Sequence, residues 1–355
     1  MSALTSVLFG ILMFSVLIFV HELGHFIAAK ASGVQVNEFS MFMGPAIFKK
    51  QGKETLYTIR CIPLGGYCAM EGEDEDTDNP RSFQKAAWWK RLIILVSGAA
   101  MNFLLGILLF FLIALPGQQM VTTTVDSVTD CYPYSAQTGI QPGDRILEIN
   151  GEKVYVSADV TFLINFFGGD SHDFVVERNG QRLEFNDMRV HDCKDSNGND
   201  VRHFGFSMGI KDMNLLDKMG YAWNMTLDNV RNVRLSLAML FSGRAGFKDM
   251  MGPVGIVDTM TEVATQSNTW LDAFMNILSF GAFIAVNLGV MNLLPIPALD
   301  GGRVVGLLLT TAIEGVTKKK LDPKYEGYIH GVGMILLLGL MGVILFKDVF
   351  MIFKG

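Results

Sequence analysis

The stretch LTSVLFGILMFSVLIFVHELGHFIAAK, from Leu4 to Lys30, joins an apolar segment to a cluster of ionisable residues. A helix that crosses a membrane needs about 20 predominantly apolar residues. His21, Glu22 and His25 follow before that length is complete, so a spanning helix here would carry them inside the membrane. Ionisable side chains are costly there, and the pattern therefore indicates a functional site.

The composition of the whole chain is that of a membrane protein. Of its 355 residues, 50% are hydrophobic and only 18% are charged, and the mean hydropathy is +0.33. An ordinary soluble domain is less apolar than this. The formal net charge of −6 argues against nucleic acid as a partner. We therefore predict a multi-pass α-helical membrane protein in contact with the lipid bilayer.

Four transmembrane helices are predicted, at approximately Val7–Ala29, Leu92–Leu115, Phe274–Leu294 and Gly331–Phe346. The first is not expected to be a cleavable signal peptide, because it has neither basic residues before it nor a small-residue cleavage site after it. Lys and Arg gather in segments 49–90 and 303–324, which are therefore expected on the cytoplasmic side. The long segment between the second and third spans is then extracytoplasmic.

Residues 121–213 are predicted to form an extracytoplasmic β-rich domain. Its clearest stretch, GIQPGDRILEINGEKV (Gly139–Val154), has a Pro-Gly-Asp turn, an alternating strand and an Asn-Gly hairpin turn. A short helix is expected over Ser157–Phe167, and a second hairpin over His172–Phe185. The stretch resembles the core of a bacterial PDZ domain, and PDZ domains bind extended peptides at a sheet edge. The alternative is a β-hairpin module without a peptide ligand.

Two further segments connect these parts. Residues 214–269 are predicted to be a juxtamembrane helical segment, in which Leu215–Phe241 is amphipathic and either lies on the membrane surface or packs on the third span. On the cytoplasmic side, residues 49–70 are predicted to form a β-loop that dips toward the membrane, with β-type residues at Thr55–Ile62 and a turn at Gly65-Gly66. The acidic residues that follow, at 71–78, indicate a solvated loop, because their spacing is not that of a calcium loop.

The HELGH pentapeptide has the chemistry of a metal site. Residues four apart share one face of a helix, so His21 and His25 can bind the same metal ion, and imidazole suits Zn²⁺. Glu22, beside them, can act as general base on metal-bound water. A catalytic zinc needs a third protein ligand, which can be His, Glu or Asp.

Asp300 is the best candidate for the third ligand. It follows an apolar run broken by Pro295 and Pro297, and it precedes Gly301-Gly302. The first and third spans cross the membrane in the same direction, so their inner ends lie at the same depth. Irregular backbone is tolerated at membrane depth only where protein or water surrounds it. The sequence thus predicts that His21, His25 and Asp300 meet.

These motifs together resemble the site-2 protease family of intramembrane zinc metalloproteases, and most closely the bacterial regulator-of-sigma-E protease type, here with a single PDZ domain. The resemblance rests on HELGH, the PDZ-like insert, NLLPIPALDGG (Asn292–Gly302), Ile62–Gln84 and Ser97–Leu109, and it covers nearly the whole chain. It implies one Zn²⁺ per chain, bound by His21, His25 and Asp300, and a catalytic Glu22. It also places Asn292 near the substrate and gives the β-loop the role of holding the substrate in extended form. The implied substrate-binding residues of that loop are Thr55, Leu56, Tyr57, Thr58, Ile59, Gly65 and Gly66.

The resemblance further implies regulated proteolysis in the bacterial plasma membrane, with the active site near the cytoplasmic side. The expected substrates are transmembrane helices of single-span proteins, such as anti-sigma factors, and remnant signal peptides. The PDZ domain is expected either to act as a size filter or to bind peptide C-termini, such as the new end left by a first cut. The expected domains are an N-terminal membrane core (1–120), the PDZ domain (121–213), the juxtamembrane segment (214–269) and a C-terminal membrane core (270–355).

Two departures and two rival functions stand beside this prediction. The best-known enterobacterial members carry two PDZ domains, and the family often has Gly-Pro where this chain has Gly98-Ala99. A metal or proton transporter could also place His, Glu and Asp in a membrane, although this chain has no inverted repeat. A membrane adaptor with an inactive protease core is the second rival.

In the outer domain, Cys131 and Cys193 form either a disulfide or two free thiols.

Overall fold

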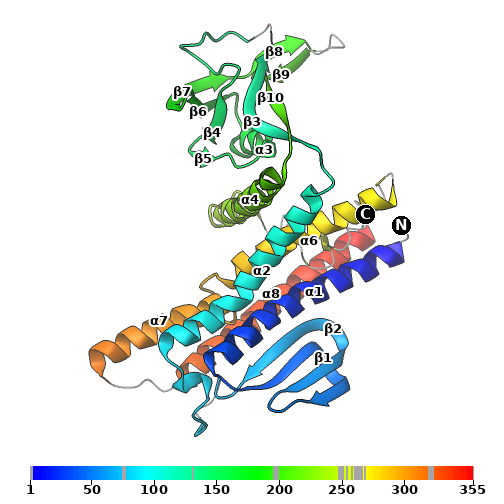
Figure 1. Cartoon of the computed structure of the whole chain (residues 1–355), viewed down its shortest axis with the longest axis vertical. Helices are drawn as coiled ribbons and strands as arrows, with labels where there is room; N and C mark the ends of the chain where they lie inside the picture. The colour runs from blue at the N-terminus through cyan, green and yellow to red at the C-terminus, as the bar shows by residue number, and fades with distance from the viewer. Residues whose placement is uncertain are drawn as a thin grey trace. The chain divides into compact units, whose positions relative to one another are not determined.

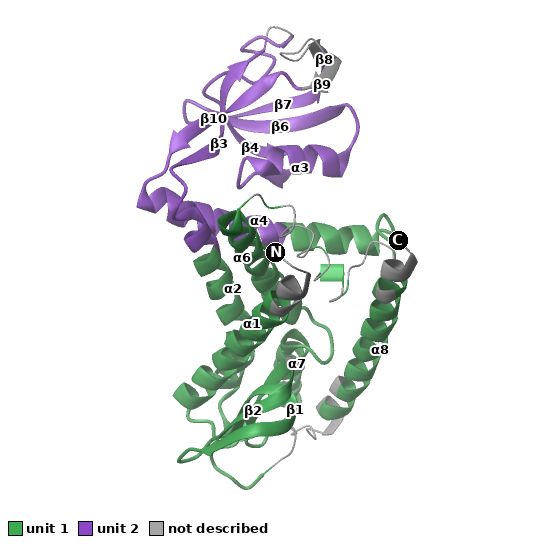
Figure 2. Cartoon of the chain, turned by 90° about the vertical axis from the view of Figure 1, so that its right-hand side faces the viewer, with its two compact units in different colours: residues 1–109, 232–355 green, residues 110–231 purple. Residues whose placement is uncertain are grey.

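The computed structural model describes residues 3–73, 77–129, 132–194, 200–246, 252, 255, 256, 259, 267, 269–318 and 324–354. The chain divides into two compact units (Figure 2), one formed by Met1–Leu109 with Asn232–Gly355 and the other by Phe110–Arg231. The first unit holds the apolar helices and the second is rich in β-structure. Cys131 lies outside the described residues, so the disulfide stays a prediction.

The prediction of four long apolar helices is confirmed. They are α1 (Ala3–Ser32), α2 (Trp88–Ala114), α6 (Trp270–Asn292) and α8 (Lys324–Lys354). Each contains a stretch long and apolar enough to cross a membrane: Phe9–Ser32, Trp88–Ala114, Trp270–Asn292 and Gly327–Asp348. The fourth is longer than expected, because polar residues flank its apolar centre and continue the helix. HELGH lies inside α1, as the periodicity predicted.

Helices α1, α2 and α6 pack side by side (Figure 1). Leu17 of α1 and Ala285 of α6 are buried at their interface, where Leu105 of α2 joins them. Small residues allow the close approach: a Cβ added at Gly106 of α2 would lie 2.5 Å from Val286 Cγ2 of α6. Packing through small side chains is the usual way in which membrane helices associate, because lipid supplies no hydrophobic drive.

A β-hairpin lies beside α1 and is larger than the sequence predicted. Its strands are β1 (Val36–Gln51) and β2 (Leu56–Met70), so β-structure begins well before residue 49. Val36 and Phe39 explain the extension, because their side chains are buried against α1 and α2 in one apolar cluster. The turn lies at residues 52–55. Gly65 and Gly66 both belong to β2 and do not interrupt it. The chain nevertheless reverses between residues 59 and 66, which both pair with Met41, and Gly65 has a φ of 83° there.

The hairpin folds back on itself, which gives its segments different numbers of neighbours. Residues 38–41 of β1 pair with residues 56–59 and also with residues 66–69 of β2. Residues 56–59 pair in addition with residues 48–51. Segments 38–41 and 56–59 therefore have neighbours on both sides, whereas 66–69 has only one neighbour among the described strands.

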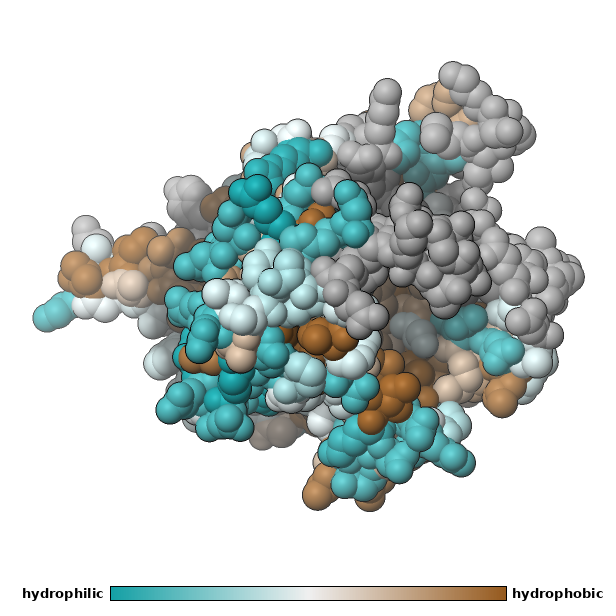
Figure 3. All heavy atoms as spheres, turned by 90° about the horizontal axis from the view of Figure 1, so that it is seen from above, coloured by the Kyte–Doolittle hydropathy of each residue, from teal (hydrophilic) through white to brown (hydrophobic). Residues whose placement is uncertain are grey.

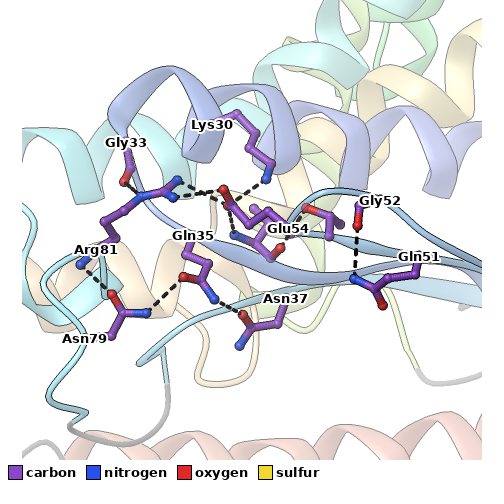
Figure 4. Close-up of polar contacts among 11 residues, drawn as sticks. Lys30, Gly33, Gln35, Asn37, Gln51, Gly52, Glu54, Asn79 and Arg81 are labelled. Carbon is purple, nitrogen blue, oxygen red and sulfur yellow. Dashed lines mark hydrogen bonds and ion pairs between the residues drawn. The ribbon is translucent and has the colours of Figure 1, made fainter.

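The turn of the hairpin is fixed by Glu54 (Figure 4). Lys30 Nζ donates to Glu54 Oε1 at 2.8 Å, and Arg81 Nη1 donates to Glu54 Oε2 at 2.9 Å. These two cations lower the pKa of Glu54 from an ordinary 4.5 to about 2. Thr55 Oγ1 donates to the Val36 carbonyl at 2.7 Å. The turn is thus tied both to the end of α1 and to the segment before α2.

Asp300 begins a helix that the sequence did not predict, α7 (Asp300–Thr317). It follows the break at residues 293–299, where Pro295 and Pro297 remove backbone donors and Ala298 takes a φ of 78°. The backbone of residues 293–294 passes close to Gly301, and a Cβ on Gly301 would lie 2.3 Å from the carbonyl oxygens of Leu293 and Leu294. Position 301 therefore requires glycine. Leu307 of α7 is buried in the cluster that α1, α2 and the hairpin share.

The second unit is built on one antiparallel sheet. Its elements are β3 (Gln119–Val128), β4 (Arg145–Ile149), β5 (Glu152–Lys153), α3 (Ala158–Phe167), β6 (Ser171–Arg178), β7 (Gln181–Arg189), β8 (His191–Lys194), β9 (Asp200–His203) and β10 (Phe206–Asp212). The main sheet has the order β10-β3-β4-β6-β7, with β5 paired to β4, and β8 and β9 form a separate two-stranded pair among the described strands. Both Asn-Gly hairpin turns are confirmed, since Asn150-Gly151 and Asn179-Gly180 all have positive φ.

Helix α4 (Leu215–Phe241) confirms the predicted amphipathic helix. Its start is capped reciprocally, because Asn214 Oδ1 accepts from the Asp217 amide and Asp217 Oδ2 accepts from the Asn214 amide. Leu216 and Trp223 of this helix are exposed. On the face drawn in Figure 3, hydrophilic residues predominate among the coloured atoms, and the hydrophobic residues form separate groups.

Candidate metal centre

Helix α1 brings His21 and His25 together on one face. Their Nε2 atoms lie 3.2 Å apart and their ring planes are close to perpendicular, at 83°. Both residues are buried, with 8% and 7% of their surface exposed. The i, i+4 spacing of an α-helix produces this pair directly.

Asp300 completes the cluster from the first turn of α7. Its Oδ2 lies 3.2 Å from His21 Nε2 and 3.3 Å from His25 Nε2. These residues form a group of potential ligands whose donor atoms all lie within 4.8 Å of one another. The structure therefore brings the three predicted ligands to one point, although Asp300 is separated from them by most of the chain.

The three side chains fit a Zn²⁺ ion. Two ligand atoms bound tetrahedrally at about 2.0–2.1 Å from zinc lie about 3.3 Å from each other. The observed separations of 3.2, 3.2 and 3.3 Å agree with that value. Asp300 Oδ2 is also buried without a hydrogen bond of acceptable geometry among the described residues. A buried carboxylate oxygen with no donor is explained when a cation lies between it and the imidazoles.

Helix α2 supports the two imidazoles from the other side. His25 Nδ1 lies 2.8 Å from the Ile94 carbonyl oxygen, and His21 Nδ1 lies 3.2 Å from Asn102 Nδ2. Between these residues, a Cβ on Gly98 would lie only 2.4 Å from His25 Nε2. Ile94, Gly98 and Asn102 are four residues apart in turn, so they share one face of α2.

The sequence analysis did not select Asn102 or Gly98 as site residues. Asn102 could have been selected, because a buried amide in an apolar span needs a hydrogen-bonding partner. Gly98 carried no such signal, since glycine is common in membrane helices. Its role follows only from the position of α1 against it.

Glu22 lies in a cavity of about 460 Å³ that also contains the cluster. The strand β2 contributes to its wall through residues 66–70, and α7 contributes through Asp300 and Arg303. A Cβ on Gly66 would lie 3.4 Å from Glu22 Cγ. The carboxylate of Glu22 therefore shares a space with the cluster and with one strand of the hairpin.

An ion pair links two walls of this cavity. Arg303 Nη1 of α7 donates to Glu73 Oε1, which lies just after β2. Glu73 also accepts from the Met70 amide, at 3.4 Å. The helix that carries Asp300 is thus tied to the end of the strand that faces Glu22.

Asn292 ends α6 beside the cluster. Its Nδ2 lies 3.4 Å from His21 Nδ1 and 3.5 Å from His21 Nε2. It is close to both nitrogens of the ring, so its amide can reach a group bound next to His21.

The predicted β-loop residues fall in different places. Gly66 lines the cavity with Glu22, while Gly65 packs against Met43, whose Cε would lie 2.8 Å from an added Cβ. Tyr57, Thr58 and Ile59 line a separate apolar cavity of about 380 Å³ beneath Phe19 and Phe26 of α1. Leu56 pairs with Glu38 and Gln51, and Thr55 is buried at the turn.

Comparison with known proteins shows the family of this chain. A family model described as Peptidase family M50 matches residues 9–340. A putative zinc metalloprotease of Clostridium acetobutylicum is 34% identical over 345 residues, which cover 97% of this chain and 97% of that protein. A putative zinc metalloprotease of Fusobacterium nucleatum is 33% identical over 352 residues, covering 98% and 99%. The regulator of sigma-W protease RasP of Bacillus subtilis is 26% identical, and the match covers 96% of this chain and 97% of that protein.

The match spans the first three apolar helices and most of the fourth, together with His21, Glu22, His25 and Asp300. It favours a peptidase over the transporter and the inactive adaptor. The chain belongs to peptidase family M50, the family of the site-2 proteases that its motifs predicted.

Proposed function

We propose that this chain is an intramembrane zinc endopeptidase, in which His21, His25 and Asp300 bind one Zn²⁺ and Glu22 is the catalytic residue. The observation that carries the proposal is the convergence of three ligand atoms, at 3.2–3.3 Å from one another. Two of them, from His21 and His25, belong to a helix long and apolar enough to span a membrane. The names of the relatives, zinc metalloproteases, support the choice of metal.

His21, His25 and Asp300 would hold the Zn²⁺ ion, which would supply Lewis-acid chemistry by polarising the peptide carbonyl and lowering the pKa of a bound water. Glu22 accepts the proton of the attacking water and delivers it to the nitrogen of the leaving amine. Its position in the same cavity as the ligand cluster supports this role. Asn292, whose amide lies beside His21, binds the substrate backbone next to the scissile bond.

The substrate is held as an extended strand. A peptide bond inside a helix is shielded and its carbonyl is already hydrogen-bonded, so the substrate helix must unwind first. Residues 66–69 of β2 have one strand neighbour among those described and line the cavity of Glu22. Their free edge can supply the lost backbone hydrogen bonds by strand addition. Of the predicted loop residues, Gly66 lines the cavity and can contact the substrate directly. Residues 56–59 form an inner strand of the hairpin, and Thr55 lies at its turn.

The substrates are transmembrane segments of single-span proteins, such as anti-sigma factors or remnant signal peptides, within the bacterial plasma membrane. The name of the Bacillus subtilis relative, a regulator of sigma-W, supports this class. The β-rich unit is a single extracytoplasmic PDZ domain within residues 121–213, joined through the juxtamembrane segment 214–269 to the membrane core. It binds peptide C-termini, and the catalytic cavity faces the cytoplasmic side.

The test uses purified protein in detergent and a single-span test substrate with helix-breaking residues. We expect one cut inside the apolar segment, mapped by mass spectrometry, and its loss on treatment with 1,10-phenanthroline. Asp300→Asn should lose both zinc and cleavage. Asp126→Asn, an exposed position in β3, is the matched control. Full zinc content in Asp300→Asn, or cuts only outside the apolar segment, would refute the proposal.

A further inference from the structure

The orientation of the His21 and His25 rings depends on the groups that contact their Nδ1 atoms. Their Nε2 atoms face each other and Asp300 Oδ2, so each Nδ1 points away from the common point. An imidazole that binds a metal through Nε2 carries its proton on Nδ1. Each Nδ1–H therefore needs a hydrogen-bond acceptor in this buried place.

His25 has such an acceptor in the backbone of α2. Its Nδ1 donates to the Ile94 carbonyl oxygen at 2.8 Å. This bond fixes both the tautomer and the direction of the ring. The acceptor is a backbone carbonyl, which also accepts from Ser97 Oγ at 2.6 Å, so no further side chain is needed for His25.

His21 meets a side chain at the equivalent position. Asn102 Nδ2 lies 3.2 Å from His21 Nδ1, and Asn102 is fully buried, with 0% of its surface exposed. Asn102 Oδ1 is buried and has no hydrogen-bond partner among the described residues. If His21 Nδ1 is protonated, this orientation of the Asn102 amide places two donors, His21 Nδ1–H and Asn102 Nδ2, against each other. It also leaves the acceptor, Asn102 Oδ1, without a donor among the described residues.

Rotation of the amide by 180° removes both defects. The two ends of an asparagine amide have nearly the same shape, and their assignment follows from the hydrogen-bond network. After rotation, Oδ1 takes the position 3.2 Å from His21 Nδ1 and accepts its proton. Asn292 is less suited to this task, because its Nδ2 lies about equally far from both ring nitrogens, at 3.4 and 3.5 Å.

We infer that Asn102 is a positioning residue of the metal centre, whose Oδ1 accepts a hydrogen bond from His21 Nδ1–H and holds the Nε2 lone pair toward the metal. The inference rests on the proposed zinc site. Together with Ile94 and Gly98, Asn102 makes one face of α2 into a support for both imidazoles. Outer-shell acceptors of this kind typically change metal affinity by about 10–100-fold when they are removed.

The test compares zinc binding by full-length variants in detergent. Asn102→Leu keeps the size of the side chain and removes the acceptor, whereas Asn102→Asp keeps an acceptor. Ser15→Ala is the matched control, because Ser15 is buried in α1 but donates to the Ile11 carbonyl within its own helix. Zinc affinity is measured by competition with a chelator, and Co²⁺-substituted protein gives the visible spectrum of the site.

We expect zinc affinity to fall about 10–100-fold in Asn102→Leu, with a shifted Co²⁺ spectrum, and to be retained in Asn102→Asp and Ser15→Ala. Equal affinity in wild type and Asn102→Leu would overturn the inference, as would an equal loss in Asn102→Leu and Asn102→Asp. A wild-type protein that binds no zinc would instead overturn the proposed function.

A measurement on the wild type covers the case in which Asn102→Leu does not fold. Nitrogen-15 NMR of zinc-loaded protein with labelled histidine reports which ring nitrogen of His21 is protonated. We expect a proton on Nδ1, hydrogen-bonded to the carbonyl of the Asn102 side chain. An unprotonated Nδ1 would contradict the inference without any substitution.

Discussion

His21, His25 and Asp300 show why ionisable residues are tolerated in an apolar bundle. Burial of an unpaired charge or an unsatisfied imidazole is costly, and the group then tends to change its protonation state. Three buried ligand atoms that face one point can instead share a cation, while α2 satisfies the outer nitrogens. The cost of burial and the binding of metal are thus two aspects of the same arrangement.

Gly98 provides a test of this arrangement at a residue that bears no functional group. A methyl group in Gly98→Ala would lie 2.4 Å from His25 Nε2 and 2.7 Å from His21 Cε1, so the imidazoles would have to move. We expect zinc affinity to fall at least about tenfold, as for other changes that misplace ligands. Metal analysis of the purified variant, with the rate of cleavage, checks this.

Gly339→Ala in α8 is the control for that experiment. It is also a glycine in a helix, and an added Cβ would meet nothing within 4 Å. It should keep wild-type zinc content and activity, because alanine only favours the helix there. Normal zinc binding in Gly98→Ala would show that α2 does not pack against the imidazoles as described.

At the scale of single residues, the sequence selected the three residues that the structure brings together, but not the residues of α2 that contact them. Helix periodicity places His21 and His25 of HELGH on one face. Asp300 was selected because the first and third spans cross the membrane in the same direction. Asn102 and Gly98 act through the contact between α1 and α2. A contact between two helices depends on their rotation about their axes, and no local pattern specifies that rotation.

At the scale of elements, the β1–β2 hairpin depends on its turn. The Glu54 carboxylate accepts from Lys30 and Arg81, and its pKa is about 2 in the folded protein against an ordinary 4.5. A depressed pKa means that the stabilisation is complete above about pH 4.5 and is lost as the pH falls toward 2.

We therefore predict that wild type is more stable than Glu54→Gln at pH 7 and that this difference shrinks on acidification to pH 3. Midpoints of thermal unfolding in detergent, at one scan rate, measure it. Glu184→Gln, whose side chain is 64% exposed in β7, serves as the control and should show little difference at either pH. A Glu54→Gln difference that is independent of pH would rule out the ionic tie.

The elements that the sequence missed are those stabilised by tertiary packing. Strand β1 begins at Val36 because Val36 and Phe39 are buried against the helices. Helix α7 forms after Asp300 because its glycines fit against the break at residues 293–299 and Leu307 enters the same cluster. The Asn-Gly turns of the β-rich unit were predictable, because positive φ at both positions is a local requirement.

At the scale of the whole molecule, the distribution of Lys and Arg predicts the orientation. The segment with the hairpin should face the cytoplasm, and the β-rich unit should lie outside. Cys61 is an exposed residue of β2 and can report the first location. Glu184→Cys, in β7, can report the second in a background without the natural cysteines.

We predict that a membrane-impermeant thiol reagent modifies Glu184→Cys in intact cells that express the protein. Cys61, kept as the only cysteine, should react only after the membrane is permeabilised. Mass-tag shifts on a gel give the readout. The reverse pattern would invert the topology and would place the catalytic cavity near the outer side.

The family and the four apolar helices were predictable from sequence because each rests on a long or specific pattern. The expected domain boundaries, which follow changes in composition, stay a prediction. The chain passes from one compact unit to the other at Leu109/Phe110 and at Arg231/Asn232, inside α2 and α4. A helix that continues from one unit into the next leaves no such change at the boundary.

The most direct measurement is the cleavage of a single-span substrate by wild type and by Glu22→Gln, with zinc content determined on the same samples. Because Glu22 is proposed to move the proton and not to bind the metal, Glu22→Gln should keep its zinc and lose about 10²–10⁴-fold in rate. Wild-type activity should disappear when 1,10-phenanthroline removes the metal. Cleavage by Glu22→Gln at the wild-type rate would contradict the mechanism.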